Sequence, residues 1–86
     1  MIKIIEEQLR KEYGGEIKCG GIDVTVSFMK NKISHFIEHT FDRYPGHGGE
    51  FKPEYVLTIV TTENSKLQFS FYSESDRERF IKDYLM

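Results

Sequence analysis

Seven consecutive residues from Tyr55 to Thr61, in the order Tyr-Val-Leu-Thr-Ile-Val-Thr, are aromatic, aliphatic or β-branched at every position. A strand places successive side chains on opposite faces of a sheet, so this segment would be largely apolar on both faces. Such a strand has to lie in the interior of a sheet. The pattern therefore predicts a central strand, and the rest of the chain has to supply its neighbours and its cover.

The chain is short and has one cysteine. Its 86 residues suffice for one domain, and we expect residues 1–86 to form a single compact domain. Cys19 has no second cysteine in this sequence with which to form an intramolecular disulfide, so helix and sheet packing has to supply the stability. Hydrophobic residues make up 38% of the sequence and aromatic residues 14%, which is enough for a small core.

The residues after the central strand predict a turn, a second strand and a final helix. Glu63-Asn64-Ser65 is typical of a turn, and residues 66–72 alternate between apolar and polar side chains. Ser73 or Ser75 would then cap a C-terminal helix, with Ser75 and Glu78 at the spacing of a capping box. The side chains expected to face the core from this strand and helix are Leu67, Phe69, Phe71, Phe80, Ile81, Tyr84 and Leu85.

The first part of the chain predicts a helix followed by a hairpin. Residues 2–13 carry apolar side chains at helical spacing and charged residues on the other face, and Gly14-Gly15 would end this helix. Residues 16–19 and 22–28 are strand-like and flank Gly20-Gly21, which is typical of a tight hairpin turn. The expected register pairs Cys19 with Ile22, Ile17 with Val24, and Lys18 with Asp23.

Residues 33–44 fit two different elements, a helix or a strand. The helix gives the cleaner separation of apolar and polar side chains, whereas the strand would suit the short connection at residues 30–32. The apolar stripe of the helix would consist of Ile33, Phe36, Ile37, Phe41 and Tyr44. The strand would place Phe36 on one face and, on the other, Ile33, His35, Ile37, His39 and Phe41.

Together these elements predict an α+β fold. We expect a small antiparallel sheet of four or five strands, an N-terminal helix, a C-terminal helix, and a helix or strand at 33–44. Helices packed on one face of the sheet would cover the apolar side chains most simply.

All three histidines, His35, His39 and His47, fall in one short stretch. On a helix, His35 and His39 would lie one turn apart, which suits two imidazoles on one metal ion. The string from His35 to His39 also matches H-x-x-E-H, in which two histidines hold zinc and the glutamate, here Glu38, polarises water. One hypothesis is therefore a metal site at His35, His39 and His47, or a zinc hydrolase-like site with Glu38. The other is that His35 and His39 lie on a solvated polar face.

Residues 44–53 contain three glycines and two prolines, so we expect a loop without regular structure. The loop lacks the lysine and the hydroxyl of a phosphate-binding loop. It does carry aromatic side chains, and small binding domains commonly place their contacts on such loops. Tyr44, His47 and Phe51 are the candidate partner-binding residues. The alternatives are that the loop is a plain connection and that Phe51 packs into the core.

The charge balance bears on the class of partner. The chain has 12 Lys+Arg against 14 Asp+Glu, a formal net charge of -2. A general nucleic-acid binder is expected to be strongly basic, so we do not expect a nucleic-acid partner. A nucleic-acid contact through Lys30, Lys32, His39 and Arg43 is a third option, although ordinary surface charge accounts for these residues as well.

These observations lead to a hypothesis about function. We expect a small non-enzymatic protein-binding module, a stand-alone regulator or inhibitor of the kind that phages and mobile elements encode, which blocks a protein partner sterically. The alternative is the metal-binding or zinc hydrolase-like protein described above. We expect no cofactor, no membrane association and a cytoplasmic location, because no apolar run approaches the roughly 18 residues of a membrane span. Homodimerisation through an exposed strand edge is a further variant.

Overall fold

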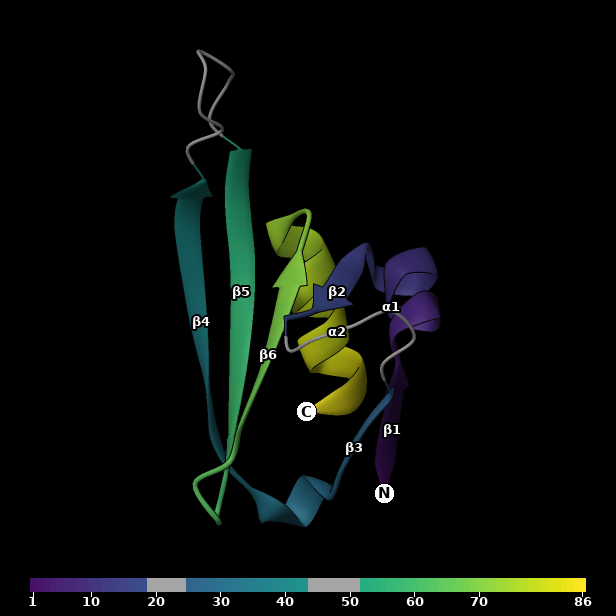
Figure 1. The fold of residues 1–86 in the computed structure, drawn as a ribbon, viewed down its shortest axis with the longest axis vertical. Helices are drawn as coiled ribbons and strands as arrows, with labels where there is room; N and C mark the ends of the chain where they lie inside the picture. The colour runs from purple at the N-terminus through teal and green to yellow at the C-terminus, as the bar shows by residue number, and fades with distance from the viewer. Residues whose placement is uncertain (19–24, 44–51) are drawn as a thin grey trace.

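The computed structural model describes residues 1–18, 25–43 and 52–86 (Figure 1). In these residues the chain forms two helices and two antiparallel sheets, one with the strand order β2-β6-β5-β4 and one with β1 beside β3. The predicted α+β class is confirmed. The elements are β1 (Ile2–Ile5), α1 (Glu6–Tyr13), β2 (Gly15–Ile17), β3 (Thr25–Phe28), the 3-10 helix η1 (Lys30–Lys32), β4 (Ile33–Arg43), β5 (Lys52–Thr61), β6 (Lys66–Phe71) and α2 (Glu74–Tyr84).

The predicted central strand is confirmed as β5, which lies between β4 and β6. Leu57 and Ile59 point to the face covered by α2 and are fully buried, and Val56 on the opposite face is 2% exposed. The turn after β5 is also confirmed, with Asn64 in the left-handed region at φ 64°. Asparagine tolerates that conformation better than other residues with a Cβ.

Residues 33–43 form a strand, so the helical interpretation of this segment is wrong. Its register with β5 runs from the pair Ile33 and Thr61 to the pair Arg43 and Lys52, with a bulge between Ile33 and His35. Because β5 is apolar on both faces, it needs a neighbouring strand on each edge, and this requirement outweighs the helical spacing.

The predicted loop at 44–53 is too long at its C-terminal end. β5 already begins at Lys52, and Pro53 pairs with Asp42 of β4. Proline is tolerated at the start of a strand, where its missing N–H costs little. Residues 44–51 lie outside the described part of the chain.

The N-terminal predictions need two corrections. Residues 2–5 form a strand and not the start of a helix, because Ile4 reaches the core when β1 pairs with β3. The predicted hairpin is also wrong in its described part: Ile17 pairs with Phe69 of β6, and Val26 pairs with Ile4. Pairing with β6 brings Ile17 into the main core, whereas an isolated hairpin would leave it half in water. The expected turn and its flanking residues 19–24 lie outside the described residues.

The C-terminal helix follows the prediction closely. Ser73 is its N-cap, and its hydroxyl accepts a hydrogen bond from the Asp76 N–H at 3.1 Å. Ser75 does not cap the helix; its hydroxyl lies 3.2 Å from that of Ser73. Phe80 and Ile81 are buried, as the apolar stripe predicts.

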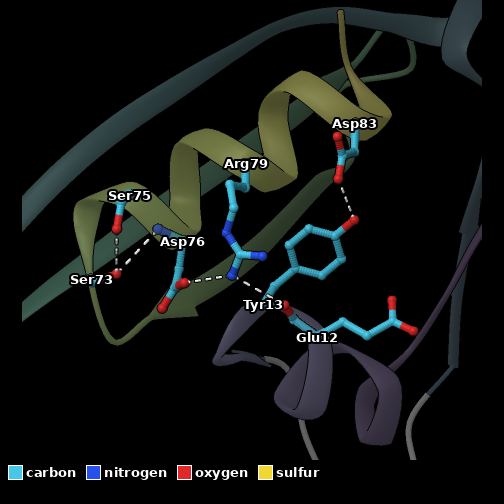
Figure 2. A network of polar contacts seen from close by, with 7 residues as sticks. All are labelled: Glu12, Tyr13, Ser73, Ser75, Asp76, Arg79 and Asp83. Carbon is cyan, nitrogen blue, oxygen red and sulfur yellow. Dashed lines mark hydrogen bonds and ion pairs between the residues drawn. The ribbon is translucent and has the colours of Figure 1, made fainter.

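α2 packs on one face of the four-stranded sheet and also joins α1 to the sheet. The ring of Phe80 lies 5.2 Å from that of Phe69 and 5.6 Å from that of Tyr13. Figure 2 shows the polar contacts at the α1–α2 junction. There Arg79 donates to the Glu12 carbonyl at 3.1 Å, and the Tyr13 hydroxyl donates to Asp83 at 2.6 Å.

Candidate functional site

The four-stranded sheet has one face without a helix over it. In the view of Figure 1, α2 lies behind the sheet and no helix crosses the near face of β4 and β5. The alternation of side chains assigns His35, Ile37, His39 and Phe41 of β4 to this open face, beside Val56, Thr58 and Val60 of β5. We call these four β4 side chains the open-face strip.

Two large apolar side chains of the open-face strip are exposed to solvent. Ile37 is 39% exposed and Phe41 is 51% exposed. The ring of His39 stacks on the ring of Phe41, with their centroids 5.6 Å apart and an angle of 21° between their planes. Exposed aliphatic and aromatic groups along one strand, with a polar ring between them, are found on surfaces that contact another protein.

The β5 side chains beside the open-face strip are buried. Val56, Thr58 and Val60 are buried, and Gln68 of β6 donates to the Thr58 hydroxyl at 3.2 Å. Nearby on the same face, Lys18, which directly follows β2, forms an ion pair with Glu54 at 2.6 Å. The strip therefore lies beside buried side chains of β5, with a charged pair next to its Phe41 end.

β4 is also an edge strand, because in the described sheet it pairs only with β5. Hydrogen-bonded and non-hydrogen-bonded residues alternate along an antiparallel pair. Thr61 donates its N–H to the Ser65 carbonyl toward β6 at 2.9 Å, and Thr62 donates to the Lys32 carbonyl toward β4 at 2.8 Å. By this alternation, one set of β4 residues directs its backbone N–H and C=O groups away from β5. These outward residues are Phe36, Glu38, Thr40 and Asp42.

The side chains of the outward residues lie on the α2 face of the sheet. There Arg77 of α2, whose side chain is buried, donates to the His39 carbonyl at 2.7 Å and lies 3.4 Å from the Val56 carbonyl. Its Nε atom is 3.4 Å from Glu38 Oε1. Arg77 therefore holds β4 against α2 and fixes the position of the edge.

The strand geometry keeps His35 and His39 apart. They are four residues apart on one face of β4, which separates their Cα atoms by about 13 Å, with Ile37 between them. Glu38 lies on the other face beside Arg77. No group of three or more His, Cys, Asp or Glu side chains able to hold a metal ion occurs in the described ranges. His47, the third predicted ligand, lies outside those ranges.

The remaining predicted site residues are only partly placed. Tyr44, His47 and Phe51 all lie in the segment 44–51, outside the described residues, so their assignment to partner binding stays a prediction. Lys30 and Lys32 are exposed on η1, at the opposite end of β4 from Arg43. His39 lies on the open face in between. The four residues of the predicted basic group are thus spread along the whole strand.

Sequence reasoning named neither Ile37 nor Phe41 as a site residue, and it did not find Arg77. The strand alternative did place Ile37 and Phe41 on one face with His35 and His39. This alternation was the sequence pattern that could have identified Ile37 and Phe41 as site residues. It also placed Ile33 there, but the bulge after Ile33 turns that side chain toward the core.

No family model matches the chain, and neither do the curated proteins or the solved structures with which it was compared. Neither of the two helices in the described ranges is long and apolar enough to cross a membrane.

Proposed function

We propose that this chain is a small non-enzymatic protein-binding module that docks a protein partner on the open-face strip. By covering a surface of that partner, it acts as a stand-alone regulator or inhibitor. The observation that carries the proposal is the exposure of Ile37 and Phe41, on either side of His39 along β4, on a sheet face that α1 and α2 leave open.

The chemistry of the strip supports a protein as the occupant. Ile37 and Phe41 offer apolar area, whose removal from water contributes roughly 25 cal/mol per Å². His39 and the adjacent Lys18–Glu54 pair offer polar groups that can orient the partner. Because the strip lies on paired strands, its backbone is already ordered, so binding does not carry the entropic cost of ordering a loop.

The segment 44–51 extends this proposal on the strength of its sequence. It connects the paired ends of β4 and β5, directly after the strip. In this proposal Tyr44, His47 and Phe51 add contacts at the Phe41 end of the strip.

A site-specific cross-linking experiment tests the proposal. The Phe41 side chain is replaced by a photoreactive phenylalanine analogue, and the chain is irradiated in a lysate of the cells that produce it. We expect one discrete cross-link to a protein other than this chain, and we expect unlabelled chain to compete with its formation. The variant Ile37→Ser/Phe41→Ser should not compete, because it lacks the apolar contacts.

Tyr72 provides the matched control, since its side chain is 69% exposed but lies outside β4. The same photoreactive group at position 72 should give no product, and Tyr72→Ser should compete like the wild-type chain. Equal products from positions 41 and 72, or competition by the double-serine variant, would show that the strip is not the docking surface.

A further inference from the structure

The outer edge of β4 is a second surface, distinct from the open face, and it is chemically complementary to itself. We propose that a second copy of this chain pairs with it, antiparallel, so that the two four-stranded sheets join into one continuous sheet. This inference concerns the backbone edge and does not depend on the identity of any other partner.

The edge offers regularly spaced hydrogen-bonding groups. Phe36, Glu38, Thr40 and Asp42 each direct one N–H and one C=O outward, as the register with β5 requires. β4 is 11 residues long, and its only bulge in the register with β5 lies at its start, between Ile33 and His35. The stretch from residue 36 to residue 42 is therefore a straight template for another strand, and edges of this kind pair readily with other strands.

One register uses all four outward residues of both copies. It places Glu38 opposite Thr40 of the second copy and Phe36 opposite Asp42 of the second copy, with the twofold axis passing at His39. Moving the axis to Glu38 would place Glu38 directly opposite Glu38 of the second copy. Moving the axis to Thr40 would place Glu38 directly opposite Asp42 of the second copy. Both shifts place like charges directly opposite each other, which is destabilising.

The same register pairs the open-face side chains favourably. Ile37 of each copy lies opposite Phe41 of the other, in non-hydrogen-bonded pairs where side chains approach closely. At the axis, His39 lies opposite His39 of the second copy. Charged groups on the same face of the sheet are Glu54 of β5, opposite Phe41, and Lys18, directly after β2, which pairs with Glu54.

Two complementary charge variants at the axis test this inference on the purified full chain. His39 is exposed, so His39→Glu and His39→Lys should both fold. Either variant alone would place two like charges at the axis, and we expect its dimer to be weaker than the wild-type dimer by about tenfold or more. An equimolar mixture would place opposite charges there, and we expect it to regain dimer.

The measurement is sedimentation velocity over a concentration series, with Thr62→Glu as the control. Thr62 lies in the exposed turn after β5, so this variant adds the same charge away from the axis and should dimerise like the wild-type chain. A wild-type chain that stays monomeric throughout the series would overturn the inference. Single variants that dimerise normally, or a mixture that stays monomeric, would overturn the proposed register. These experiments contain no other protein, so their failure would leave the cross-linking test of the proposed function unaffected.

Discussion

Arg77 shows most clearly how one side chain can organise this fold. It is a charged residue with 5% exposure, and it reaches from α2 to the carbonyl groups of two adjacent strands. Its guanidinium also lies 5.6 Å from the centre of the Tyr55 ring. Hydrogen bonds from a charged donor are stronger than neutral ones, so this contact fixes the position of β4 relative to α2.

We expect Arg77→Ala to lower the free energy of unfolding by about 2–4 kcal/mol, because it removes charged hydrogen bonds and the packing of the side-chain stem. Glu38→Gln should cost less than about 1 kcal/mol, since the Glu38 side chain is 43% exposed and its ion pair is partly screened by water. Urea unfolding of both variants checks this. Equal losses would mean that the ion pair, and not the contact with the strand carbonyls, carries the stabilisation.

Among the described residues, Tyr13 is a titratable group whose pKa folding raises. Burial raises the pKa of the Tyr13 phenol well above its ordinary value of 10, and the hydrogen bond that its hydroxyl donates to Asp83 raises the pKa further. Figure 2 shows this hydroxyl directed at Asp83. The protonated phenol is therefore part of the contact between α1 and α2.

The raised pKa makes stability depend on alkaline pH. Above about pH 10 the unfolded chain ionises this phenol while the folded chain keeps it protonated, so the free energy of unfolding falls as pH rises. Tyr13→Phe should flatten this fall and cost about 1 kcal/mol at neutral pH through the lost hydrogen bond. Urea unfolding from pH 8 to 11 measures both effects. Tyr72→Phe, at an exposed position, should keep the wild-type slope, and an unchanged slope in Tyr13→Phe would contradict the argument.

Elements with a self-contained sequence pattern could be predicted. β5 is apolar on both faces, β6 alternates strictly, and α2 has a serine cap and an apolar stripe. In each case the information lies within about ten residues. Gly14 also marks the end of α1 as expected, with φ at 57° in the left-handed region that favours glycine.

Elements whose identity depends on a distant partner could not be predicted. Ile2 and Ile4 alternate with Lys3, yet the same residues also fit a helix, and only pairing with β3 decides between the two. β4 is the same case: its pairing with β5 outweighs its helical spacing. Ile17 leaves the expected hairpin because β6 offers it a larger core. The local sequence pattern does not show that pairing with a distant strand is more favourable than a helix or a hairpin formed locally.

The candidate site was predictable to the same extent as β4. Once residues 33–43 are read as a strand, strict alternation brings Ile37, His39 and Phe41 to one face. The helical reading instead drew attention to the spacing of His35 and His39. The exposure of Ile37 and Phe41 and the position of β4 at the edge of the described sheet follow from the strand order. The contact of β4 with Arg77 follows from the position of α2. No local sequence pattern encodes either arrangement.

At the scale of the whole molecule, the fold divides its sheet into a covered face and an open one. α2 covers one face and β4 forms an outer edge of the described sheet (Figure 1). The open-face strip lies on β4, on the face that α2 does not cover. Pairing two copies along β4 would bring the two strips side by side. The docking surface proposed for another protein would then be doubled without any change within the chain.

Amide hydrogen exchange along β4, measured by NMR at low and high protein concentration, tests the central claim most directly. In dilute solution we expect fast exchange at residues 36, 38, 40 and 42 and slow exchange at 37, 39 and 41, because only the second set donates to β5. At high concentration the first set should become protected as two edges pair. Uniform exchange along β4, or an outward set that stays unprotected at every concentration, would contradict the account.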